Sequence, residues 1–223
     1  MKFSAADYLA EVSHYEKDLR LLDDTLYRLC REHPNHTTPS SVHAKLWIIG
    51  RTYATGIERK IETRKKKRSP LSKVAELFLA NGEQLDELIA ELNTIAEPLS
   101  PEKLQTVTRV HGRILKILAR ITRDGQSPRS FVSKYLHFHN SLVPIYDSRA
   151  AGVLRAFKPR TIDEFQIPAG GDTKYAEFTM RFLKLYEFVR AADLKVNVKY
   201  LDNYLLSISG KLFEIAMATD QIG

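Results

Sequence analysis

The 223-residue sequence has a single cysteine, a single tryptophan and no long uninterrupted apolar run. Cys30 alone cannot form an internal disulfide, and one cysteine excludes a four-cysteine metal cluster. A membrane helix needs about 18 or more consecutive apolar residues, so none is predicted. The N-terminal segment Met1–Val12 lacks the apolar stretch of a signal peptide. We therefore expect a soluble cytoplasmic protein, with no metal site and no cofactor.

Alternating apolar and polar residues, the pattern of a half-buried strand, are also missing. Apolar residues instead recur at helical spacing over residues 4–32, 42–68, 71–80, 83–96, 101–122, 174–192 and 198–219, and in two helices within 130–157. The sequence predicts one all-α domain of about nine or ten helices over residues 1–223. It leaves open a division into two lobes, residues 1–98 and residues 99–223.

The net charge of +7 is concentrated in one segment. Residues 43–68 hold nine of the 34 basic residues and two of the 27 acidic ones, so the remaining 25 basic and 25 acidic residues balance. A focused basic patch attracts a polyanion better than a diffuse excess does. We expect this segment to contact nucleic-acid phosphates without reading base sequence. The predicted contacts are Lys45, Arg59, Lys60, Arg64, Lys65, Lys66, Lys67 and Arg68.

Residues 130–157 read as a helix, a sharp turn and a second helix. Asn140 ends the first helix, and the residue before Pro144 is restricted to extended backbone. Asp147 stands where the N-cap of the second helix is expected. An aspartate in this place is often only a cap, which stabilises a helix by about 1 kcal/mol.

This order of parts resembles the core of the helix-hairpin-helix DNA glycosylases, in which an aspartate at the mouth of a helix helps to expel a damaged base and stabilises the sugar cation. The resemblance implies an orthogonal bundle of helices with Asp147 as the catalytic residue. Bifunctional members carry a lysine in a glycine-rich hairpin. In the corresponding place this chain has residues 124–129, which lack the glycine pattern and end with Arg129 instead of a lysine. An arginine stays protonated and cannot form a Schiff base. The resemblance therefore implies a monofunctional N-glycosylase, with Arg129 as a further nucleic-acid contact.

Several side chains lie close to Asp147 in the sequence or are charges placed among small and apolar residues. The predicted substrate-binding residues are Tyr146, Lys134, His137, His139, Arg149, Arg51 and Glu58. Because His137 and His139 are two residues apart, they point in different directions on a helix and do not form a metal pair. A solvated charged face is an equal alternative for Arg51 and Glu58.

The leading hypothesis is a DNA-binding protein that recognises or excises an altered base by N-glycosidic hydrolysis, with the base flipped into a pocket beside Tyr146. One alternative is a non-catalytic nucleic-acid-binding module. Another is a ribonuclease of the HEPN class, because Arg31 and His36 match the arginine, four residues, histidine spacing of those enzymes. The expected partner is nucleic acid, with DNA favoured over RNA. The sequence leaves the oligomeric state open.

Overall fold

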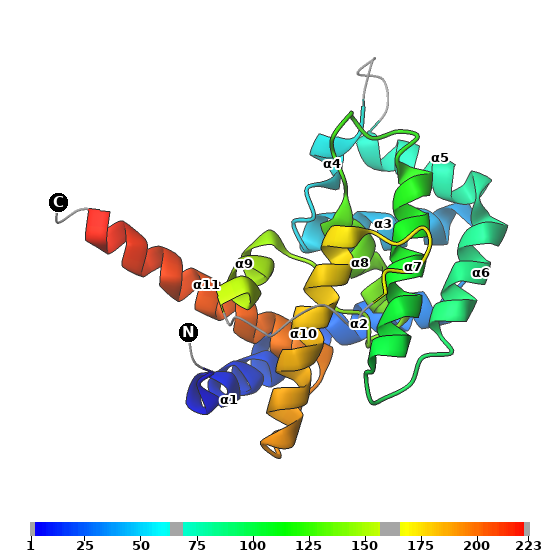
Figure 1. Cartoon of the computed structure of the whole chain (residues 1–223). Helices are drawn as coiled ribbons and strands as arrows, with labels where there is room; N and C mark the ends of the chain where they lie inside the picture. Colours follow the sequence, from blue (N-terminus) through cyan, green and yellow to red (C-terminus); the bar gives the residue numbers. More distant parts are fainter. Residues whose placement is uncertain (1–2, 63–68, 157–165, 221–223) are drawn as a thin grey trace.

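The computed structural model describes residues 3–62, 69–156 and 166–220, and these residues form a bundle of helices (Figure 1). The N-terminal half contains α1 (Ala5–His14), the π-helical η1 (Tyr15–Leu19), α2 (Arg20–Glu32), α3 (Pro39–Thr52), α4 (Ile57–Lys60), α5 (Pro70–Ala80) and α6 (Gly82–Leu92). The C-terminal half contains α7 (Pro101–Leu118), α8 (Arg129–His139), α9 (Ser148–Ala156), α10 (Thr173–Ala191) and α11 (Val198–Asp220).

The predicted all-α class is confirmed. Because α1, η1 and α2 follow one another without a break, the described residues form ten helices, in agreement with the expected nine or ten. The only β-pairing in this part of the chain is an isolated bridge between Ile61 and Thr122. No helix among the described residues is long and apolar enough to cross a membrane.

Helix α8 lies at the centre of the bundle, in contact with α2, α3 and α7 (Figure 1). Every residue from Phe131 to Phe138 is buried. A helix enclosed on all sides is usually apolar all round, but α8 also carries Ser133, Lys134 and His137. Buried polar groups need internal partners, since an unsatisfied one costs about 1–3 kcal/mol. The partners of these three side chains determine much of the geometry described below.

The prediction of one helix over residues 42–68 is wrong. Helix α3 ends at Thr52, and the chain turns through Ala54 (φ +45°) and Gly56 (φ +65°) before the short α4. The Thr55 hydroxyl donates a hydrogen bond of 2.9 Å to the Gly50 carbonyl and so closes the end of α3. Gly56 adopts the left-handed conformation at little steric cost, which apolar periodicity alone does not reveal. Residues 63–68 lie outside the described part of the chain.

The turn brings α4 beside the loop that precedes α8. The Arg123 amide donates to the Lys60 carbonyl at 2.9 Å, and the Glu62 amide donates to the Ile121 carbonyl at 2.9 Å. Two segments about 60 residues apart are thereby fixed side by side. A continuous helix would have carried Lys60 away from this loop.

The C-terminal helices α9, α10 and α11 pack against one another and against α1 and α7. Helix α11 contacts α1 and α9, and α10 contacts α7 and α9. The end of α11 extends beyond the bundle (Figure 1). One cluster of buried apolar side chains runs from Tyr8 to Leu205 and includes residues of both expected lobes.

Candidate functional site

A cavity of about 490 Å³ opens where the α3–α4 turn, the loop before α8 and the start of α9 meet. We call it the Asp147 pocket. Five of the predicted site residues line it: Arg59, Lys60, Arg129, Tyr146 and Asp147. Its volume falls within the range of small-molecule sites, about 300–1,000 Å³.

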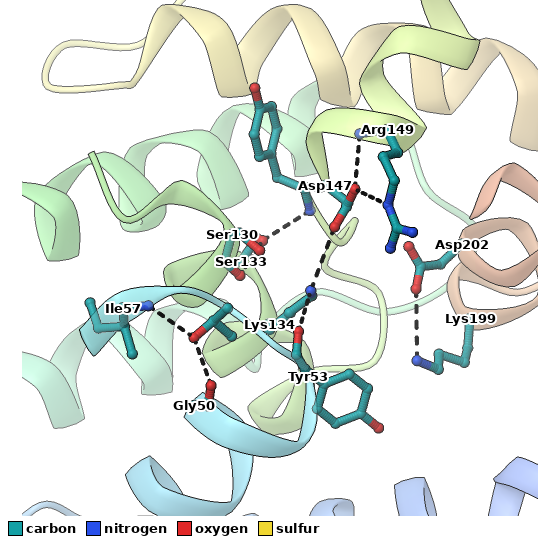
Figure 2. Close-up of polar contacts among 12 residues, drawn as sticks. Gly50, Tyr53, Ile57, Ser130, Ser133, Lys134, Asp147, Arg149, Lys199 and Asp202 are labelled. Atoms are coloured by element: carbon teal, nitrogen blue, oxygen red, sulfur yellow. Dashed lines mark hydrogen bonds and ion pairs between the residues drawn. The ribbon is translucent and has the colours of Figure 1, made fainter. Parts of the chain in front are cut away.

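Asp147 caps α9 with one carboxylate oxygen and leaves the other toward Lys134 (Figure 2). Its Oδ1 accepts a hydrogen bond of 2.9 Å from the Arg149 amide, and the Arg149 Nε lies 3.4 Å from the same oxygen. Its Oδ2 lies 3.9 Å from the Lys134 Nζ, beyond hydrogen-bond distance. The Asp147 side chain is 17% exposed, so the carboxylate is sheltered but reachable from the pocket.

Lys134 is a buried cation beneath the carboxylate. Its Nζ donates to the Tyr53 carbonyl at 2.9 Å, which fixes the side chain between the α3–α4 turn and α9 (Figure 2). Burial lowers the pKa of Lys134, while the negative charges of Asp202 and Asp147 act in the opposite direction. The two carboxylates therefore partly offset the effect of burial on the ammonium.

Three cations face the pocket from two different segments. The Lys60 Nζ donates to the Ser127 carbonyl at 2.6 Å, and its pKa is lowered by burial and by the nearby charges of Arg129 and Arg59. Arg129 is held by Asp172 through hydrogen bonds of 2.6 and 2.7 Å. Arg59 is exposed, and its side chain has no hydrogen bond or ion pair among the described residues. A group of cations that repel one another provides a favourable site for an anion.

Tyr146 stands at the edge of the pocket. Its amide donates to the Ser133 hydroxyl at 2.9 Å. This bond gives a partner to Ser133, one of the buried polar side chains of α8. Its ring meets Phe178 edge to face, with the centroids 5.2 Å apart. The preceding residues are anchored by the Tyr175 hydroxyl, which donates to the Pro144 carbonyl at 2.7 Å. The extended turn before α9 is therefore fixed from both α8 and α10.

Two predicted site residues, Lys45 and His137, are enclosed in the core and do not line the Asp147 pocket, and a third, His139, lies away from it. Lys45 is completely buried, and its Nζ donates to the His33 carbonyl at 2.8 Å. His137 bonds to the Val143 carbonyl at 2.9 Å and to the Tyr27 hydroxyl. The His139 Nε2 is buried without a partner among the described residues. His139, at the end of α8, lines a separate cavity of about 700 Å³. Lys45 and His137 face other helices, and sequence spacing did not distinguish that face.

Arg51 and Glu58 pair with each other across the α3–α4 turn. Their Nε and Oε1 atoms lie 3.0 Å apart, and Arg51 also lies over the Trp47 ring. Both side chains are well exposed and neither lines the Asp147 pocket. Arg149 is likewise exposed, beside Asp147. The predicted contacts Arg64, Lys65, Lys66, Lys67 and Arg68 lie outside the described residues.

The Arg31 and His36 pair is not presented as a ribonuclease site. Helix α2 ends at Glu32, so the two residues do not share a helix. His36 is completely buried: its Nδ1 bonds to Asp86 at 2.6 Å and its Nε2 to the Tyr135 hydroxyl at 2.7 Å. Burial, together with the charge of Lys45, lowers the pKa of His36 to about 4. Its two ring nitrogens are already engaged, so we do not propose this activity.

Sequence reasoning missed a buried charge cluster behind the pocket. The Lys199 Nζ lies 3.4 Å from the Asp23 Oδ2 and 3.7 Å from the Asp202 Oδ2, and all three side chains are buried. Burial raises the pKa of both aspartates, against the charge of Lys199. Spacing of three residues between Lys199 and Asp202 was visible in the sequence, but such pairs usually lie on solvated helix faces.

The fold and site define an all-α protein with a basic pocket around one helix-capping aspartate. No three histidine, cysteine, aspartate or glutamate side chains in the described ranges are placed to hold a metal ion. Comparisons of the chain with protein-family models, with curated proteins and with solved structures gave no match. The chemistry of the pocket therefore has to be argued from its own residues.

Proposed function

We propose that this protein binds nucleic acid, takes one nucleotide into the Asp147 pocket and uses Asp147 to hydrolyse the N-glycosidic bond of an altered base. The observation that carries the proposal is that Asp147 shares one cavity with Tyr146 and with the cations Arg59, Lys60 and Arg129. A nucleotide consists of a phosphate and an aromatic base joined by a sugar. The pocket offers a matching group for each.

The cations supply the sequence-independent part of binding. Because the Arg59 guanidinium has no partner within the described part of the chain, it can pair with a phosphate. Lys60 is held at Ser127 by one of its three N–H donors and keeps two others for an anion. Arg129 is oriented by Asp172 and adds positive charge at the same wall. Charge-assisted hydrogen bonds of this kind are the strong contacts in phosphate recognition.

The carboxylate supplies the chemistry. Loss of the base from a nucleoside passes through an oxocarbenium-like sugar, which a fixed carboxylate stabilises electrostatically. The Asp147 Oδ1 is committed to the Arg149 amide, whereas Oδ2 has no hydrogen-bond donor within 3.5 Å among the described residues. The nearest cation to Oδ2 in the buried wall is the Lys134 Nζ, 3.9 Å away. Oδ2 is therefore the oxygen that orients water or faces the sugar cation.

A non-catalytic binding module is the second candidate. It is favoured by the bond from the Arg149 amide and the proximity of Lys134, because both give Asp147 a structural reason to be present. Binding through the cations would then proceed without base excision. The two candidates make the same prediction for Arg59 and different predictions for Asp147.

The test uses Asp147→Asn, since asparagine caps helices about as well as aspartate and leaves the pocket shape unchanged. Single- and double-stranded DNA with a panel of altered bases, and RNA of the same sequence, are assayed for base release and for binding. We expect Asp147→Asn to abolish release and to leave affinity within about twofold. Unchanged release by the variant would refute the catalytic role, and absence of release by the wild type would favour the binding module.

The binding part is tested with Arg59→Gln. Each lost phosphate contact should weaken binding by about fivefold at 0.1 M salt and lower the salt slope by about 0.7–0.9. The matched control is Arg28→Gln, which removes an exposed arginine on α2 that lines neither this pocket nor the one described next. Equal losses for both variants, or an affinity independent of salt, would contradict binding at the Asp147 pocket.

A further inference from the structure

A second, smaller cavity of about 190 Å³ lies between α9 and α10, on the other side of Tyr146. We call it the α9–α10 pocket. Its walls carry three basic residues and one acidic residue: Arg155, Lys174, Arg181 and Glu177. None of these residues belongs to the basic segment 43–68 in which the sequence concentrates its net charge.

The basic side chains of this pocket make no polar contact with the part of the chain that the structure describes. Arg155 comes from the last turn of α9, and Lys174 and Arg181 come from α10. None of the three has a hydrogen bond or ion pair among the described residues. Glu177 and Arg181 are four residues apart, a spacing that suits an ion pair on a helix, and they do not form one here. The guanidinium of Arg181 is therefore available to a ligand.

Tyr146 joins this pocket to the Asp147 pocket because it lines both. Its ring is held edge to face against Phe178, which also lines the second pocket. The backbone of Tyr146 is fixed at the same time by its bond to Ser133. Two basic hollows thus share one anchored aromatic residue. Alternation of cations with an aromatic side chain is the arrangement by which proteins follow a single strand.

We propose that the α9–α10 pocket binds the phosphate that neighbours the nucleotide in the Asp147 pocket, so that the strand passes over Tyr146 from one pocket to the other. This inference rests on the proposed function and adds a second phosphate-binding site to it. Arg155 and Arg181 hold the phosphate oxygens, and Tyr146 stacks on or separates the adjacent bases. Glu177 keeps the pocket from binding anions without discrimination.

The experiment measures the binding of single-stranded thymidine oligonucleotides of increasing length to the wild type and to three variants. The double variant Arg155→Gln/Arg181→Gln removes the α9–α10 pocket's guanidinium groups, and Arg59→Gln removes a cation of the Asp147 pocket. The matched control, Arg190→Gln, removes an exposed arginine on α10 that lines neither pocket. Each titration is repeated between about 0.05 and 0.2 M salt.

We expect the double variant to bind the shortest oligonucleotide like the wild type and to lose the gain that an added phosphate gives, about fivefold at 0.1 M salt. Its salt slope on longer strands should fall by about 0.7, while Arg190→Gln changes neither quantity. If Arg59→Gln weakens binding and the double variant does not, the second phosphate site is refuted and the proposed function stands. If the wild type binds no oligonucleotide, both proposals are refuted.

Discussion

Buried neutral histidines should make this protein sensitive to mild acid. His36, His111 and His137 are completely buried, and burial is the main cause that lowers the pKa of His36 and His111 to about 4 and that of His137 to about 3. An unfolded histidine has a pKa of about 6.5. The unfolded chain therefore binds more protons below this pH, and the free energy of unfolding decreases as pH falls from about 6.5 toward about 4.

The magnitude follows from the difference in bound protons. Each histidine that is neutral in the fold and charged when unfolded reduces stability by about 1.4 kcal/mol per pH unit, or about 2 kcal/mol at pH 5. Three such residues remove up to about 6 kcal/mol, against a total stability of about 5–15 kcal/mol for a typical domain. Most carboxylates titrate near pH 4, but burial raises the pKa of Asp23 and Asp202, so the histidine contribution is taken from the difference between the wild type and a histidine variant between about pH 7 and about pH 5.

The assay is urea unfolding at constant ionic strength across this range, with His111→Phe as the test variant. The His111 ring stacks on Tyr175 at a centroid distance of 3.7 Å and makes one bond of 3.3 Å to the Arg129 carbonyl, so phenylalanine keeps the stacking. Its pH slope should be lower than that of the wild type by about 1.4 kcal/mol per pH unit. The control His33→Gln changes an exposed ring and should leave the slope unchanged. Equal slopes for His111→Phe and the wild type would refute the reasoning.

Two further predictions concern close packing and buried charge. In Gly112→Ala the new Cβ would clash with the Gly170 carbonyl oxygen, so the loop must shift and urea unfolding should show a loss of about 1–3 kcal/mol. An unchanged midpoint would contradict this contact. Lys199→Met leaves Asp23 and Asp202 buried without their shared cation and should destabilise by about 3–5 kcal/mol at neutral pH, with a smaller loss in acid, where the aspartates are protonated. A loss that does not depend on pH would show that packing, not charge, is the cause.

The sequence predicted the helices well because their apolar residues face a core. Helix α7 begins as expected after Ser100, whose hydroxyl accepts from the Lys103 amide, since a serine followed by proline is a strong local signal.

The turn at residues 53–56, which the sequence did not predict, has an equally local cause. The apolar spacing of α3 continues through Ile57 and Ile61, so periodicity gave no sign of a turn, and only the conformation of Gly56 and the bond from Thr55 end the helix.

The candidate site was only partly predictable. Asp147 was identified because capping and chain order are local properties, and Arg59, Lys60, Arg129 and Tyr146 do line its pocket. The positions of Lys45 and His137 depend on helices far away in the sequence, which bury them. The cations of the α9–α10 pocket were not considered, because they are separated along the chain and meet only when α9 packs on α10.

The Arg129–Asp172 pair links a cation of the Asp147 pocket to the start of α10, which lines the α9–α10 pocket. Asp172 accepts a hydrogen bond of 2.8 Å from the Tyr175 amide at the start of α10 while it holds the Arg129 guanidinium. Although burial opposes it, these bonds keep the pKa of Asp172 below its usual range, so the pair remains ionised at neutral pH. Tyr175 in turn bonds to the Pro144 carbonyl that precedes Tyr146. Since the same helix start orients a cation of one pocket and supplies the wall of the other, a strand bound across Tyr146 would meet both pockets in a fixed relative position.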